Sequence, residues 1–128
     1  MSIMARARAK DPNKGYALDF VSAAIKPNLA LIAERGIKVV SNAGGVNPEA
    51  CVAALREEIA AQGLSLTVAC VQGDDLLERK EQMARSGVTE MFSGSAFPPA
   101  EKVLSINAYL GAFPVATALA RGADIVVT

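Results

Sequence analysis

The sequence of 128 residues contains no histidine and no tryptophan, and aromatic residues make up only 5% of it. The absence of histidine excludes Ser-His-Asp and Cys-His nucleophile pairs built from this chain alone, and it removes the most common metal ligand. Any chemistry that these residues perform must therefore use carboxylates, hydroxyls, amides, lysine or backbone N–H groups. We predict no metal site, and the sequence indicates no particular cofactor.

Cysteine is also scarce, with only Cys51 and Cys70, so we expect no disulfide framework and a reducing, cytoplasmic location. Lys plus Arg and Asp plus Glu number 13 each, which gives no reason to expect nucleic acid or a membrane surface as a partner. No apolar run approaches the length of a membrane span. Hydrophobic residues still make up 52% of the chain, so residues 1–128 are expected to form a single folded domain.

Apolar strand-like runs alternate with helical patterns along the chain. Pro27 is expected to kink or split the first long helical pattern, because it lacks an N–H group. The alternation predicts an α/β fold with a Rossmann-like parallel sheet, flanked by helices and incomplete at both ends. The expected strands are residues 37–41, 64–71, 102–106 and 124–128, and the main expected helices are residues 16–35, 48–62, 76–85 and 112–121.

Polar loops follow three of the expected strands. In open α/β sheets, ligands lie beyond the carboxyl ends of the strands. This rule places residues 41–47, 72–75 and 107–111 together at one edge of the sheet. We therefore look for the functional residues in these three loops.

The first loop, SNAGGVNPEA at residues 41–50, has two interpretations. Gly44 and Gly45 precede an expected helix start, where free N–H groups and a partial positive charge favour an anion; Asn42 and Asn47 would complete the site. However, the spacing matches neither G-x-G-x-x-G nor G-K-[ST]. The loop is equally explained as a tight turn in which Asn47 caps the helix.

The second and third loops offer the candidate catalytic groups. One of Asp74 and Asp75 caps a helix, and the other is a candidate general acid or base. Asn107 offers an amide and Tyr109 a phenol, which are suited to bind a carbonyl oxygen. The alternative for each of these residues is a purely structural role at a helix end or at the edge of the core.

Four segments taken together resemble the acyclic terpene utilisation family, also described as an AtuA-like domain of unknown function. They are KDPNKGYALDFV, GIKVVSNAGGVNPEAC, VQGDDLL and INAYLGAFPVATALARGADIVVT, and they span most of the chain. The resemblance implies a role in the breakdown of acyclic terpenoids as coenzyme A esters. It also implies further segments before Met1 and after Thr128, so we interpret the chain as an internal fragment whose partner is the rest of the same polypeptide.

Two functions are compatible with these observations. The first is part of an enzyme of branched acyl-CoA catabolism, of lyase or hydratase type, with an anionic small molecule as substrate. In it, Asp74 or Asp75 and Asn107 would be catalytic, and Asn42, Gly44, Gly45, Asn47 and Tyr109 would bind the substrate. The alternative is a non-catalytic α/β module that assembles with copies of itself or with a partner chain, such as a carboxylase-type complex.

Overall fold

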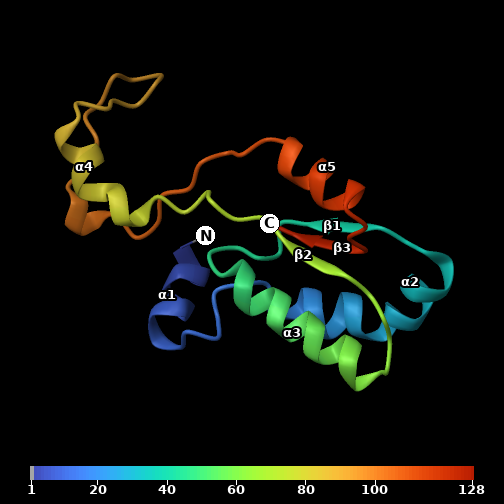
Figure 1. The fold of residues 1–128 in the computed structure, drawn as a ribbon. Helices are drawn as coiled ribbons and strands as arrows, with labels where there is room; N and C mark the ends of the chain where they lie inside the picture. The colour runs from blue at the N-terminus through green and yellow to red at the C-terminus, as the bar shows by residue number, and fades with distance from the viewer. Residues whose placement is uncertain (1) are drawn as a thin grey trace.

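The fold is centred on three short parallel strands. The computed structural model describes residues 2–128, in which β1 (Val39–Ser41), β2 (Val68–Cys70) and β3 (Ile125–Val127) form one sheet in the order β1-β3-β2 (Figure 1). β3 pairs in parallel with both of its neighbours. The prediction that these segments belong to one parallel sheet is confirmed, and so is the α/β class. The Rossmann-like arrangement stays a prediction.

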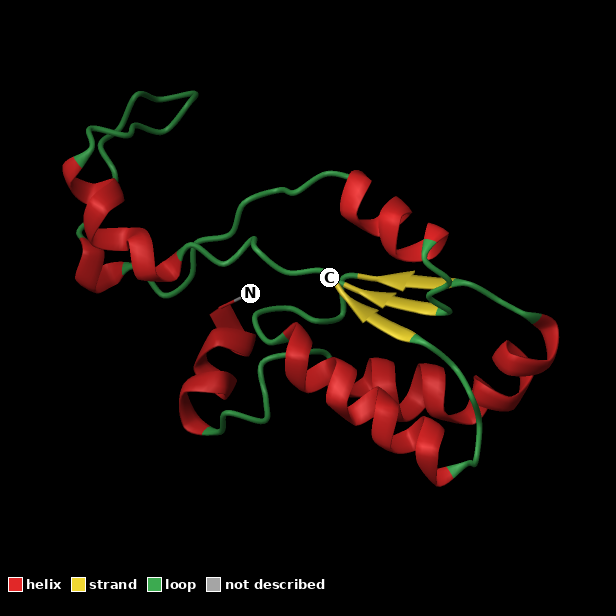
Figure 2. Ribbon diagram, in the orientation of Figure 1, coloured by secondary structure: helices red, strands yellow, loops and turns green. Residues whose placement is uncertain are grey.

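The main core lies between one face of the sheet and a layer of helices (Figure 2). Helix α3 (Pro48–Ala61) begins and ends close to the predicted positions, with Asn47 as its N-cap and Pro48 as its first residue. Because side chains alternate along a strand, Ile125 and Val127 face this layer. Eight helical residues complete this core: Val21, Ile25, Leu29, Ile32, Cys51, Val52, Leu55 and Ile59.

The predicted break at Pro27 is confirmed. The helical pattern at residues 16–35 folds as a π-helix η1 (Phe20–Ile25), a 3₁₀ turn η2 (Lys26–Asn28) and an α-helix α2 (Leu29–Arg35). Proline cannot donate the backbone bond that a continuous helix needs. The wider π turn keeps the apolar side chains on both sides of the break directed at the same face of the sheet.

The opposite face of the sheet is covered more thinly. Helix α5 (Phe113–Ala120) packs there through Val115, Ala118 and Leu119, against a small buried cluster that includes Val126 of β3. No residue of α5 is fully buried. The sheet therefore has a thick apolar layer on one side and a single short helix on the other (Figure 1).

Residues 76–106 form a lobe that projects away from the sheet (Figure 1). The predicted helix at residues 76–85 is shortened to a 3₁₀ turn η3 (Leu77–Arg79) and α4 (Lys80–Arg85), which pack on each other and on the 3₁₀ turn η4 (Ala100–Lys102). The predicted strand at residues 102–106 is wrong. Among the described residues, no strand of the sheet lies alongside this segment for it to pair with.

The lobe is joined to the sheet by a neck of two antiparallel segments. Leu76 N donates to Ile106 O at 2.8 Å, and Ala108 N donates to Asp74 O at 2.8 Å. Asp75 and Asn107 form an isolated antiparallel bridge between these two bonds. All three candidate catalytic residues, Asp74, Asp75 and Asn107, therefore lie in the neck.

At the opposite end of the sheet, Asp124 ties the three strand starts together. Its carboxylate accepts from Lys38 Nζ at 2.7 Å, next to β1, and from Thr67 N at 2.8 Å, next to β2. The hydrogen bond from Lys38, and then that from Thr67, lowers the pKa of Asp124. Asp124 therefore stabilises the fold as a carboxylate and loses this effect when it is protonated.

We predict that Asp124→Asn lowers the free energy of unfolding by about 1 kcal/mol at pH 7, a modest value because Lys38 is half exposed and its charge is screened by solvent. Because the folded pKa is depressed, the stabilisation is complete above the ordinary aspartate value of 3.8 and is lost as the pH falls through the lower folded pKa. Urea titrations across this pH range should show the difference between variant and wild type shrinking. Asp19→Asn, at an exposed carboxylate, serves as the control. A difference that stays constant down to pH 2 would contradict the prediction.

Candidate functional site

The loop between β1 and α3 is a tight, internally bonded turn. Gly45 N donates to Asn42 O at 3.3 Å, and Val46 N donates to Gly15 O at 2.9 Å. Gly45 has a φ of +59°. These two N–H groups are therefore not available to a ligand. The N–H groups of Gly44 and Glu49 have no hydrogen-bond partner among residues 2–128.

Asn47 is held in place by several hydrogen bonds. Its side-chain oxygen caps α3 by accepting from Ala50 N at 3.4 Å, as the turn interpretation expects. Its Nδ2 donates to Pro12 O at 2.7 Å and to Lys14 O at 2.8 Å. Asn47 is also buried. Its amide thus joins the segment after α1 to the start of α3, and its polar atoms already have partners within the protein.

The two aspartates of the neck have different partners. Asp74 Oδ2 accepts from Asn107 Nδ2 at 2.8 Å. Asp75 Oδ1 accepts from Leu77 N at 3.0 Å, which makes it the residue that caps the turn opening the lobe. Asp74 is half-buried, whereas Asp75 is exposed. The structure thus brings the three candidate catalytic residues together, but Asn107 joins them through the neck and not from the predicted strand at residues 102–106.

Arg8 of helix α1 (Ser2–Lys10) also reaches this site, which no pattern in the sequence indicated. Its Nη1 donates to the carbonyl oxygen of Val46 and lies 3.6 Å from Asp75 Oδ2. The guanidinium therefore links α1, the loop before α3 and the neck of the lobe. Because Arg8 is far from the other site residues in the chain, no local motif could have revealed this contact.

Two adjoining cavities open between these elements. The smaller, of about 100 Å³, is lined by the loop before α3 and by residues of the neck. The larger, of about 480 Å³, lies between α1 and the base of the lobe and is mainly apolar, with Ala5, Ala9, Leu77 and Leu104 in its wall. The residues common to both walls are Arg8, Val46, Asp75 and Asn107. We call the smaller cavity the polar recess and the larger one the apolar trough. Asp75, a candidate acid or base, thus lies where the recess meets the trough.

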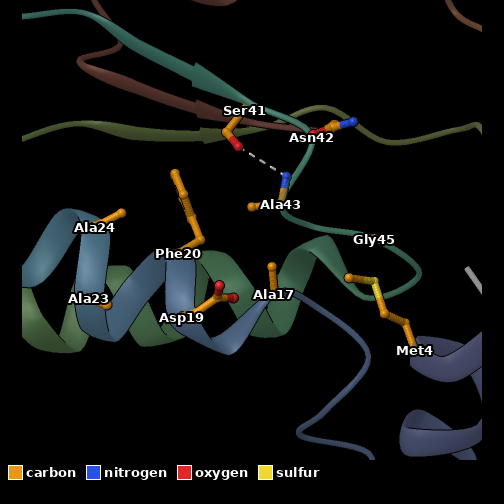
Figure 3. Close-up of a pocket in the computed structure, with 10 residues that line it drawn as sticks. All are labelled: Met4, Ala17, Asp19, Phe20, Ala23, Ala24, Ser41, Asn42, Ala43 and Gly45. Atoms are coloured by element: carbon orange, nitrogen blue, oxygen red, sulfur yellow. Dashed lines mark hydrogen bonds between the residues drawn. The ribbon is translucent and has the colours of Figure 1, made fainter.

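A third cavity, of about 610 Å³, lies on the other side of the same loop, against η1 (Figure 3). Phe20 stands in it between the helix and the end of β1, and Met4 reaches into it from α1. The Ser41 hydroxyl accepts from Ala43 N at 3.2 Å. Asn42 lines this cavity, not the two that the neck borders, and its side chain points away from Phe20 (Figure 3).

Tyr109 is fully exposed and lines none of these three cavities. Only Ala108 separates it from Asn107, but the neck ends at Ala108 and the chain then continues toward α5. The predicted role of its phenol in binding therefore has no supporting contact in the described part of the chain. Within residues 2–128 there is likewise no group of His, Cys, Asp or Glu side chains arranged to hold a metal ion.

Cys51 is fully buried in the main core, and burial raises its pKa to about 11. Cys70 is half-buried at the edge of the sheet, and burial raises the pKa of this thiol as well. Both thiols are free and stay protonated at neutral pH, so neither is an activated nucleophile. Among residues 2–128, no helix combines the length and the apolar character needed to cross a membrane.

The fold and the site define a class: an α/β protein whose candidate ligand site lies at the carboxyl edge of a parallel sheet. Residues 1–128, the whole chain, match the family described as acyclic terpene utilisation family protein AtuA. The chain belongs to this family, so it takes part in the utilisation of acyclic terpenes. No curated protein and no solved structure gives a significant match to it.

Proposed function

We propose that this chain contributes the substrate site of an enzyme that breaks down acyclic terpenoids as branched acyl-CoA esters, by a proton-transfer reaction of lyase or hydratase type. The observation that carries the proposal is the shared wall of the two cavities. There, Asp75 and Asn107 lie between a polar recess at the start of α3 and an apolar trough of about 480 Å³. A branched acyl chain suits the trough in size and polarity.

The carboxylates are suited to move a proton next to a carbonyl group. Asn107 orients Asp74 through its amide, and the backbone of Leu77 orients Asp75. A general base must be held in place, and it must lie within hydrogen-bond reach of the proton that it removes. Both aspartates are held in place by these hydrogen bonds. The side-chain amide of Asn107 and the N–H group of Glu49 are the groups that would donate hydrogen bonds to the carbonyl oxygen as negative charge develops on it.

The proposal places the chain in the cytoplasm, because its two free thiols are suited to a reducing compartment. The alternative, a non-catalytic module that assembles with a partner chain, is favoured by one observation. Two large apolar side chains, Met91 and Phe92, are 84% and 88% exposed at the tip of the lobe. Exposed apolar groups of this kind are typical of contact surfaces.

The test is deuterium exchange into a branched acyl-CoA ester, isovaleryl-CoA, in D₂O. Mass spectrometry should detect exchange at the carbon next to the thioester in the wild type. In Asp74→Asn or Asp75→Asn it should fall by about 100-fold or more, because a positioned acid or base contributes about 10²–10⁴-fold. The control is Glu34→Gln, which removes one exposed carboxylate from α2. Wild-type exchange that both aspartate variants keep would contradict the proposed roles of these residues.

A further inference from the structure

The polar recess is unusually rich in carboxylates for a site that binds an anion. Glu49, Asp74 and Asp75 line the smaller cavity, and Arg8 is the only cation in its described wall. A phosphate group at the start of α3 would face three carboxylates. The anionic group of a ligand is therefore expected on the side of Arg8, where the smaller cavity meets the larger one.

Arg8 is oriented toward this junction by two contacts that use only part of its hydrogen-bonding capacity. One guanidinium nitrogen donates to the Val46 carbonyl and also faces Asp75 at 3.6 Å. A close guanidinium–carboxylate pair has a separation of about 2.7–2.9 Å, so the Arg8–Asp75 pair is loose. The guanidinium has five N–H donors, and the remaining ones are left for another acceptor.

The trough beside Arg8 indicates what the rest of the ligand is. Its apolar wall is formed by Ala5, Ala9, Val46, Leu77 and Leu104, and Glu78 and Ser105 also line it. Arg6 also lines it, but among residues 2–128 Arg6 makes no hydrogen bond or ion pair that would fix its position. An apolar chain in the trough therefore brings its polar end to Arg8 and its neighbouring carbon atoms to Asp75.

We propose that Arg8 is the substrate-binding residue that recognises a carboxylate on a branched, otherwise apolar chain, with Asp75 as its partner when the site is empty. The inference goes beyond the proposed function but uses the same trough: the carboxylate belongs to the free branched acid, because the coenzyme A ester of that acid has no carboxylate at this position. The fork of a guanidinium matches a carboxylate and a phosphate alike. A singly charged carboxylate is repelled less by the carboxylates of this recess than a more highly charged phosphate is. Asp75 repels the incoming carboxylate and weakens its binding.

The probes are 3,7-dimethyloctanoic acid and its primary amide, titrated into the full chain and followed by calorimetry. The wild type should bind the acid about 10- to 100-fold more tightly than the amide, as expected for a hydrogen bond to a charged group. Arg8→Gln should remove this preference without changing the affinity for the amide. Lys10→Gln, which removes an exposed cation from the same helix, should keep it.

Two further variants separate recognition from a structural role. Arg8→Lys should retain part of the preference, because it keeps the charge and loses the fork. Asp75→Asn should bind the acid several-fold more tightly than the wild type, which a purely structural Arg8–Asp75 contact would not produce. Circular dichroism of each variant establishes that it is folded.

The outcomes distinguish this inference from the proposed function. Equal affinity of the wild type for acid and amide would overturn the role of Arg8 and leave the trough as a site for a branched chain. Loss of the preference in Lys10→Gln as well as in Arg8→Gln would also overturn it. Binding of neither probe would overturn both proposals, because the trough would then not accept a branched chain.

Discussion

Leu55→Ala should lower the free energy of unfolding by about 2–5 kcal/mol, the range found when a fully buried leucine is truncated and a cavity is left. Leu55 has no exposed surface and lies in the main core with Ile125 and Val127 of β3. The truncation of Leu55 therefore removes contacts between α3 and the middle strand of the sheet. Denaturant titration followed by circular dichroism measures it.

The matched control is Leu31→Ala on α2, where the same atoms are removed from a residue that is 40% exposed. Leu31→Ala should lower the free energy of unfolding by less than half as much as Leu55→Ala, because less of the removed apolar surface was buried. Similar losses at both positions would mean that α3 does not pack on the sheet as described.

Gly45→Val should destabilise the protein by about 3 kcal/mol or more, which combines a strained backbone with an overpacked site. The φ of +59° at Gly45 is unfavourable for a β-branched residue. A Cβ atom at this position would also lie 2.7 Å from the carbonyl oxygen of Gly15 and against Met4. These contacts predict damage to the fold itself and not only to a ligand site.

Gly36→Val separates the two contributions. Gly36 ends α2 with a φ of +61°, and no atom lies within 4 Å of where its Cβ would be. This variant carries the backbone strain without the collision, so thermal melts should place it between the wild type and Gly45→Val. If the two variants melt at the same temperature, the close approach of the segment before η1 to Gly45 is not a determinant of stability.

The strands could be predicted because each one lies within a short apolar run, and the middle strand β3 is buried along its whole length. The order of the strands in the sheet could not be predicted. No local feature of Ile125–Val127 indicates that β3 lies between the other two strands. The wrong strand at residues 102–106 has a similar cause. Its composition suits a strand, but a strand forms only where a partner edge is in reach, and the lobe holds this segment away from the sheet.

The candidate site was predictable to the extent that it follows the sheet. Asp74 and Asp75 follow the end of β2, whereas Asn107 meets them through the antiparallel neck and not from a strand end. Tyr109 was a candidate through its closeness to Asn107 in the chain, yet the chain leaves the neck before it. Arg8 was missed because its helix reaches the site through tertiary packing alone.

The position of β3 has a consequence for how the protein is made. β1 and β2 each pair with β3 and not with each other, and β3 is synthesised more than 50 residues after β2. At roughly 5–20 residues per second, a ribosome needs several seconds to cover that distance. During that interval both earlier strands lack their hydrogen-bonding partner, and α3 has no complete surface to pack on. A nascent chain interrupted before Ile125 would hold two open apolar edges, which are the surfaces that chaperones and aggregation compete for.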